Sequence, residues 1–126
     1  MKTEKIYTQH EENKEWSSSL SFYKEEIKIL GNRLSEIVSK NNSKEILSQV
    51  EHFQNQLIIQ KDQVDRINHE INLNNDLINS EIRKNGTAVD HRSLEDHSTL
   101  REQMESFERI FKSLKNELTA FLGRWM

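Results

Sequence analysis

Hydrophobic residues recur at alternating gaps of four and three along three stretches of the chain, at residues 16–37, 46–78 and 100–125. Polar residues fill most of the positions between them. A 3.5-residue repeat of this kind is typical of helices that pack against one another along their length. The pattern therefore predicts an all-α fold, an antiparallel up-down-up three-helix bundle with coiled-coil-like heptad packing and long second and third helices.

The residues between the three stretches predict helices at about 9–41, 43–85 and 90–125 in a single domain, 1–126. Thr8 and Glu11 match a capping box at the first helix start, and Asn42 or Ser43 can cap the second, with Glu45 three residues after Asn42. A connection as short as 41–43 brings the second helix back antiparallel to the first. Asn85-Gly86 is a typical helix end, and the third helix is expected to start after Thr87 or Ser93.

The two ends of the bundle differ in polarity. At the end with the short connection, we expect Ile37 and Ile46 near Phe121 and Trp125, and Trp16 farther along near Ile67 and Leu100. At the other end the core positions are polar, so apolar burial is expected to fade there. These positions are Gln9, Asn13, Asn74, Ser93 and His97. We expect residues 1–8, the following turns up to residue 15 and the tip at 80–95 to be mobile.

Composition supports long helices and narrows the functional classes. The 126 residues include no proline, no cysteine and three glycines, and the net charge is −3 with basic and acidic residues interspersed. Without a basic stripe we expect no nucleic-acid partner. The longest apolar run, 57–59, is too short for a membrane span, and the first residues have no apolar leader segment. We therefore expect no membrane partner and a cytoplasmic location.

Four of the five histidines fall in the polar half of the predicted bundle, and a metal site there is one hypothesis. Its candidate ligands are His10, His69, His97 and Glu70, because helical bundles hold transition metals with inward His and carboxylate side chains. No Glu-x-x-His pair occurs, however, and the alternative is a set of solvated side chains. We expect no metal and no cofactor.

Several large apolar residues lie off the core positions and are candidates for partner binding: Phe22, Ile29, Ile58, Ile59 and Leu73. In heptad terms all of them except Ile58 share one flank, and an exposed apolar flank marks an interface. The alternative is a core widened to include them. The second helix is also rich in Gln and Asn, which either fix its register or line a groove for a peptide.

Catalytic motifs are absent from the sequence. It contains no glycine-rich phosphate loop, nucleophile elbow or cysteine, so we expect no catalytic residues and no enzyme activity. The sequence favours a non-catalytic interaction or scaffold module that binds a protein partner or a second copy of itself. The alternative is a bundle that binds a metal or small ligand through histidines and carboxylates in its polar half.

Three segments carry a family resemblance: Glu51–Gln60, Val89–His97 and Phe121–Met126. With them, the chain resembles a group of small all-helical proteins of Bacteroidota-type bacteria that have no assigned function. The resemblance implies an all-helical fold over most of the chain and brings no activity, cofactor or site with it. Spectrin-type repeats also place three helices and tryptophans in about this length, which is a likeness of architecture alone.

Overall fold

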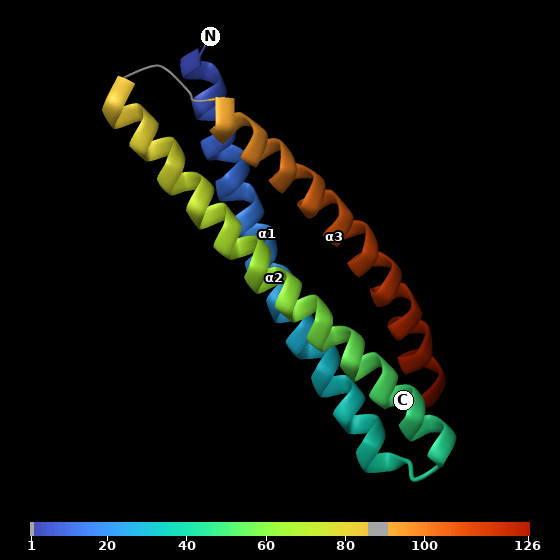
Figure 1. Ribbon diagram of the computed structural model, residues 1–126. Helices are drawn as coiled ribbons and strands as arrows, with labels where there is room; N and C mark the ends of the chain where they lie inside the picture. Colours follow the sequence, from blue (N-terminus) through green and yellow to red (C-terminus); the bar gives the residue numbers. More distant parts are fainter. Residues whose placement is uncertain (1, 86–90) are drawn as a thin grey trace.

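The computed structural model consists of three long helices that pack side by side (Figure 1). It describes residues 2–85 and 91–126, and the side chains of residues 7–80 and 97–126. Helix α1 spans Lys2–Lys40, α2 spans Lys44–Asn85 and α3 spans His91–Trp125. Each helix contacts both others, which confirms the predicted all-α three-helix bundle.

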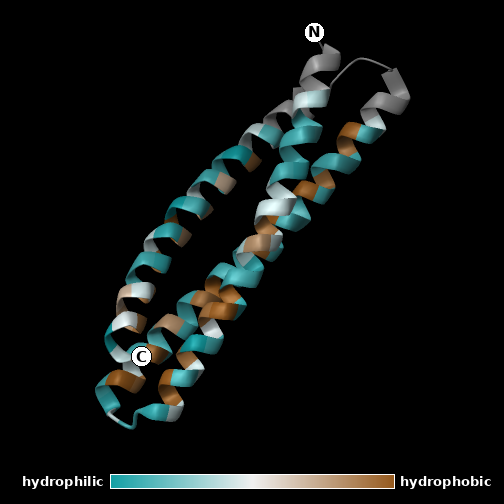
Figure 2. Ribbon diagram, turned by 180° about the vertical axis from the view of Figure 1, so that it is seen from behind, coloured by the Kyte–Doolittle hydropathy of each residue, from teal (hydrophilic) through white to brown (hydrophobic). Residues whose placement is uncertain are grey.

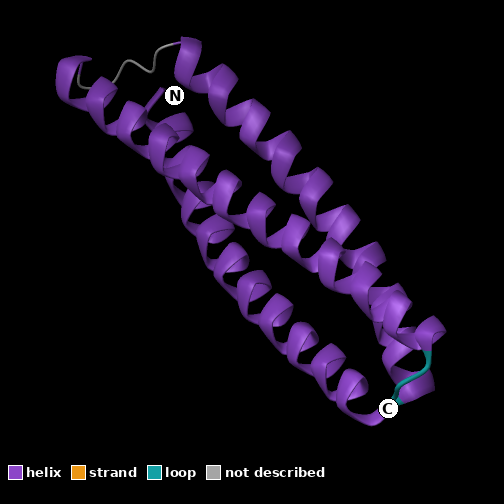
Figure 3. Ribbon diagram, turned by 60° about the horizontal axis from the view of Figure 1, so that its bottom comes forward, coloured by secondary structure: helices purple, strands orange, loops and turns teal. Residues whose placement is uncertain are grey.

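Helices α1 and α2 are joined by a three-residue connection that lies at the same end of the bundle as the C-terminus (Figure 3). The side-chain amide of Asn41 donates to the carbonyl of Ile37 at 3.0 Å and so satisfies one of the last carbonyls of α1. The carbonyl of Ser43 accepts from the amide of Leu47 at 3.0 Å, which places Ser43 at the N-cap of α2. These two polar residues allow the chain to reverse within a few residues.

The core runs along the centre of the bundle and consists of the predicted heptad positions. Hydrophobic and hydrophilic residues alternate along the helices (Figure 2), and all three helices contribute buried hydrophobic residues to one cluster. Leu34, Ile37 and Leu118 have no exposed surface, and the rings of Phe53 and Phe121 lie 5.2 Å apart between α2 and α3. Burial of these side chains is the main force that holds the helices together.

Three details of the prediction are wrong. Helix α1 begins at Lys2 rather than near Thr8, because residues 2–8 contain neither glycine nor proline to end it. Ser93 cannot start α3, which begins two residues earlier. Trp125 is 38% exposed, although it continues the heptad pattern. It is the last residue of α3, where no following turn holds it, and Leu122 packs against the core instead.

Some expectations fall outside the described residues. The start of α3 after Thr87 and residues 86–90 of the tip belong to this group, as do the side chains of residues 81–96, Ser93 among them. Within the described residues, none of the three helices has the length and apolar character needed to cross a membrane.

Candidate functional site

The polar end of the bundle contains a layer of buried polar side chains contributed by all three helices. As the heptad pattern predicted, these core positions are polar, so buried polar side chains replace part of the apolar core at this end. Asn13 is fully buried, and Gln9, Asn74 and His97 are between 2% and 4% exposed. They stay buried because several of them bond to one another across the helices, which offsets the cost of removing them from water.

His97 on α3 is the centre of this layer. Its Nδ1 lies 3.2 Å from Oδ1 of Asn74 on α2, and its Nε2 lies 3.0 Å from Oε1 of Glu12 on α1. The indole of Trp16 stacks on the imidazole. Burial lowers the pKa of His97 below its usual 6.5, although the hydrogen bond to Glu12 acts in the opposite direction. The ring therefore carries no charge at neutral pH.

Glu12 also binds Arg101 through two hydrogen bonds, from Nη2 to Oε1 at 2.6 Å and from Nε to Oε2 at 3.2 Å. This bidentate contact lowers the pKa of Glu12, although partial burial opposes it, and the hydrogen bond from His97 lowers it further. The pKa of Arg101 is raised by the same contact. Glu12 is thus a carboxylate held between two groups of α3. Sequence reasoning missed this pair, because its members lie 89 positions apart.

A chain of amides continues the layer from α2 to α1. Nδ2 of Asn13 donates to Oδ1 of Asn74 at 3.0 Å and to Oδ1 of Asn75 at 2.8 Å. Oδ1 of Asn13 is buried and accepts no hydrogen bond from the described residues. The layer is therefore a continuous set of polar contacts from Glu12 through His97 and Asn74 to Asn13. Two of its buried acceptors, Oε1 of Gln9 and Oδ1 of Asn13, have no hydrogen-bond partner among the described residues.

The candidate metal ligands are not brought together. Among the side chains that the structure describes, no three His, Asp or Glu residues are placed to hold a metal ion. His10 and His69 are exposed, whereas His97 is buried against Glu12. Glu70 instead lines a groove between α2 and α3. The physical reason is that His10 and His69 lie on the outer faces of their helices rather than at core positions.

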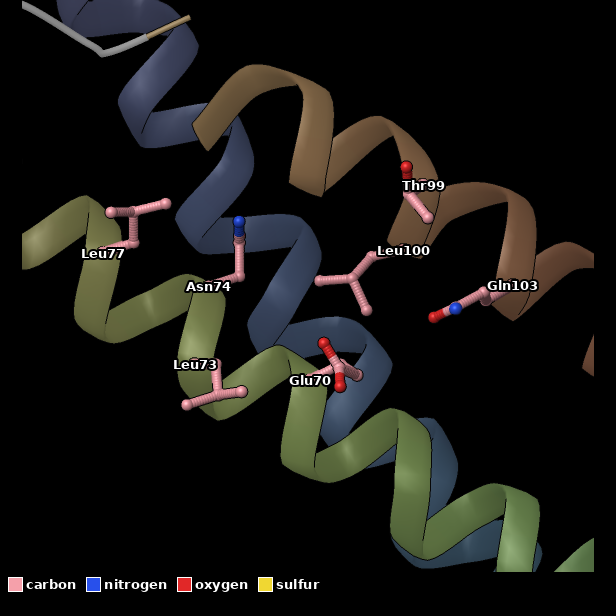
Figure 4. Close-up of a pocket in the computed structure, with 7 residues that line it drawn as sticks. All are labelled: Glu70, Leu73, Asn74, Leu77, Thr99, Leu100 and Gln103. Carbon is pink, nitrogen blue, oxygen red and sulfur yellow. The ribbon is translucent and has the colours of Figure 1, made fainter. Parts of the chain in front are cut away.

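A groove between α2 and α3 has Leu73, one of the predicted partner-binding residues, on its wall. Near the polar layer it has a volume of about 470 Å³. Its wall combines apolar, amide and carboxylate side chains from both helices (Figure 4). The lining residues are Glu70, Leu73, Asn74, Leu77, Thr99, Leu100 and Gln103.

The same side of the bundle carries two more exposed apolar residues. Ile59 precedes Leu73 by fourteen residues and Ile110 follows Gln103 by seven, so heptad spacing places each on the same side of its helix as a residue that lines the groove. Ile59 is 51% exposed, Leu73 50% and Ile110 52%. Ile110 was missed because a single isoleucine at a flanking heptad position of α3 does not stand out from the pattern.

Farther along the same two helices, a second hollow of about 570 Å³ has Gln49, His52, Glu117 and Ala120 in its lining. His52 lies seven residues before Ile59, and Glu117 lies seven after Ile110. We call this whole surface, from His52 to Leu77 on α2 and from Thr99 to Ala120 on α3, the α2·α3 groove.

Phe22 and Ile29 face a different groove. Phe22 lines a hollow between α1 and α3 together with Tyr23, Arg109 and other α3 residues, and Ile29 lies seven residues later on the same side of α1. In this hollow the hydroxyl of Tyr23 donates to Glu108 at 2.8 Å. Partial burial and the neighbouring carboxylate raise the pKa of Tyr23 to about 12.

Ile58 faces a third surface, between α1 and α2. It lies seven residues before Asp65, which binds Lys24 of α1 at 3.0 Å, and so it occupies the same side of α2. The five predicted partner-binding residues are therefore spread over three sides of the bundle, and the idea that four of them share one flank is wrong. The widened core is also wrong, because all five are at least 50% exposed.

Comparisons of the chain with protein-family models, with curated proteins and with solved structures find no match. The resemblance to small all-helical proteins stays a prediction, and the candidate function is argued from the geometry above.

Proposed function

We propose that the chain is a non-catalytic interaction module that binds an amphipathic helix of a protein partner in the α2·α3 groove. The observation that carries this proposal is the row of half-exposed apolar side chains, Ile59, Ile110 and Leu73, along one groove. A helix that buries its apolar side in such a groove removes these side chains from water. It would complete a four-helix bundle, in which each helix has two neighbours.

The dimensions of the groove suit a helix of ordinary length. From His52 to Leu77 the groove follows 26 residues of α2, which is about 40 Å at a rise of about 1.5 Å per residue. Gln103 lines the groove near one end, and Gln49 lies just beyond the other end, in the lining of the second hollow. They supply hydrogen bonds at the border of an apolar contact, as polar residues do at the rim of protein interfaces.

The charges near Leu73 indicate the chemistry of the partner. Glu70 lines the groove, Asp76 lies three residues after Leu73, and Glu102 lies three after Thr99. Both Asp76 and Glu102 are exposed. Arg66 offsets part of this charge, which leaves an acidic border. A helix with basic residues beside its apolar face complements such a border.

The test uses a synthetic helix of about four heptads, with leucine at its a and d positions and lysine at the flanking positions. Binding to the full chain is followed by fluorescence anisotropy of the labelled peptide at low salt. We expect binding that the Ile59→Glu variant weakens about tenfold, a typical effect of removing a central interface residue. A peptide with glutamate at the flanking positions should bind weakly.

Ile58→Glu is the matched control, because it adds the same charge at the adjacent residue on a different groove. Ile58 is 58% exposed and Ile59 is 51% exposed, so neither substitution disturbs the core. Equal weakening by both variants, or equal binding of the two peptides, would refute the proposal. Light scattering of the chain alone tests the competing occupant, because a dimer that Ile59→Glu dissociates would assign the groove to a second copy of the chain.

A further inference from the structure

The hydrogen bonds around His97 fit two different proton arrangements. In the structure both ring nitrogens face acceptor oxygens, Oδ1 of Asn74 and Oε1 of Glu12. Two acceptors suit an imidazolium ring, which donates from both nitrogens. A neutral ring has one N–H group, so with the same amide orientation one of its lone pairs would face an oxygen lone pair.

The carboxylate decides which nitrogen keeps its proton in the neutral ring. Glu12 is ionised and has no proton to donate, so Nε2 of His97 must carry the hydrogen and Nδ1 must accept. Nδ1 can accept from Asn74 only if the side-chain amide of Asn74 turns over and presents its nitrogen. Loss of one proton from the ring therefore reverses one amide on the neighbouring helix.

The reversal extends to α1 because Asn74 is also bonded to Asn13. Nδ2 of Asn13 now donates to Oδ1 of Asn74, and two amide nitrogens cannot face each other. Asn13 must turn over as well, and its Oδ1, which now lacks a partner, then accepts from Asn74. Asn75 is partly exposed and can present its own nitrogen to Asn13. In the reversed arrangement each contact among these side chains pairs a donor with an acceptor, and Nδ2 of Asn13 takes the buried position that its Oδ1 occupies now.

We propose that gain or loss of a proton at His97 turns over the side-chain amides of Asn74 and Asn13 together, which makes the polar layer a two-state hydrogen-bond chain through all three helices. The charged groups that face the imidazole are Glu12 from α1 and Arg101 from α3, and the group from α2 is the neutral amide of Asn74. This two-state hydrogen-bond chain does not depend on the proposed helix partner.

Nuclear magnetic resonance of the full chain between about pH 4 and 8 tests the coupling. The ring nitrogens of His97 report its proton, and the side-chain amide signals of Asn13 and Asn74 report the orientation of the amides. We expect the signals of His97, Asn13 and Asn74 all to change with the same midpoint pH. Nuclear Overhauser contacts between the amide protons of Asn74 and the ring Hε1 of His97 should be present in the neutral form and lost in the imidazolium form.

Exposed amides such as Asn55 are the internal control and should not follow His97. In a His97→Gln variant the amide signals of Asn13 should lose their dependence on pH near the His97 midpoint. The proposal is overturned if His97 titrates while the Asn13 and Asn74 contacts stay the same. It is also overturned if the signals of these amides change only when Glu12 titrates, at a lower pH than His97. The wild-type titration decides the question even if the variant does not fold.

Discussion

Trp16 and His97 stack on each other in the polar layer, with ring centroids 4.9 Å apart and planes inclined by 25°. The contact joins α1 to α3 at a level where the other core residues are polar. It gives the buried imidazole an apolar cover on one face, while Glu12 and Asn74 bind its two nitrogens. The indole is therefore an optical probe of the proton on His97.

In a Trp125→Phe variant, which leaves Trp16 as the sole tryptophan, fluorescence should fall as the pH is lowered. An imidazolium stacked on an indole quenches its emission, and the two attract through a cation–π contact. Because burial lowers the pKa of His97, the midpoint should lie below 6.5. A fluorescence titration measures it, and His97→Gln in the same background should abolish the change. Quenching that persists in that variant would point to another group.

The free energy of unfolding should decrease as the pH falls below 6.5. The pKa of His97 is lower in the folded protein than in the unfolded chain, so the unfolded chain takes up the proton first and stability is lost. The pKa of Glu12 is also lowered, which adds a second loss as the pH falls below 4.5. Urea denaturation at several pH values measures both steps.

The loss of stability below pH 6.5 should disappear in His97→Gln. It should remain in His69→Gln, which alters an exposed histidine. The free energy of unfolding could instead fall with the same slope between pH 6.5 and 5 in the wild type and in both variants. That result would assign the loss of stability to groups other than His97.

Gly31→Ala should stabilise the protein by about 0.5–1 kcal/mol, because glycine inside a helix costs roughly that amount relative to alanine. Gly31 lies within α1, and an added Cβ would meet no atom within 4 Å. Gly123→Ala is the matched control, since it also has open space but lies in the last turn of α3, where the gain should be smaller. Thermal unfolding compares the two, and a lower midpoint for Gly31→Ala would contradict the expectation.

Gln60→Leu should also stabilise the fold, by about 1–2 kcal/mol. Gln60 is 5% exposed at a core position of α2, and its Oε1 is buried with no hydrogen-bond partner among the described residues. Leucine removes this unsatisfied acceptor and buries more apolar surface. Urea denaturation with an unchanged m-value is the measurement. Destabilisation would show that the Gln60 amide makes bonds that leucine cannot replace.

The heptad pattern alone predicted the three helices and nearly all of the core, because burial along a coiled-coil-like bundle follows a 3.5-residue repeat. The end of α2 at Asn85 and the three-residue connection also followed from local sequence. Thr8 lies inside α1 rather than at its start, since a capping-box sequence does not end a helix when no glycine or proline precedes it. Local signals of this kind show where a helix can start, not where it does.

The candidate site was less predictable. A heptad position specifies a side of its own helix but not which neighbour covers that side, so Phe22 and Ile59 were grouped although they face different grooves. The contact of Glu12 with His97 and Arg101 depends on the level at which α1 lies beside α3. No residue near Glu12 in the sequence encodes that level. The buried polar layer could be located from its spacing, whereas its hydrogen bonds required the structure.

Ile58 and Ile59 are consecutive in the chain, yet one faces the surface next to α1 and the other the groove next to α3. Two adjacent residues therefore contribute to two separate surfaces. A substitution at either one changes a single surface and leaves both the core and the other surface intact. Natural variation can thus alter the two sides of α2 independently, at little risk to the fold.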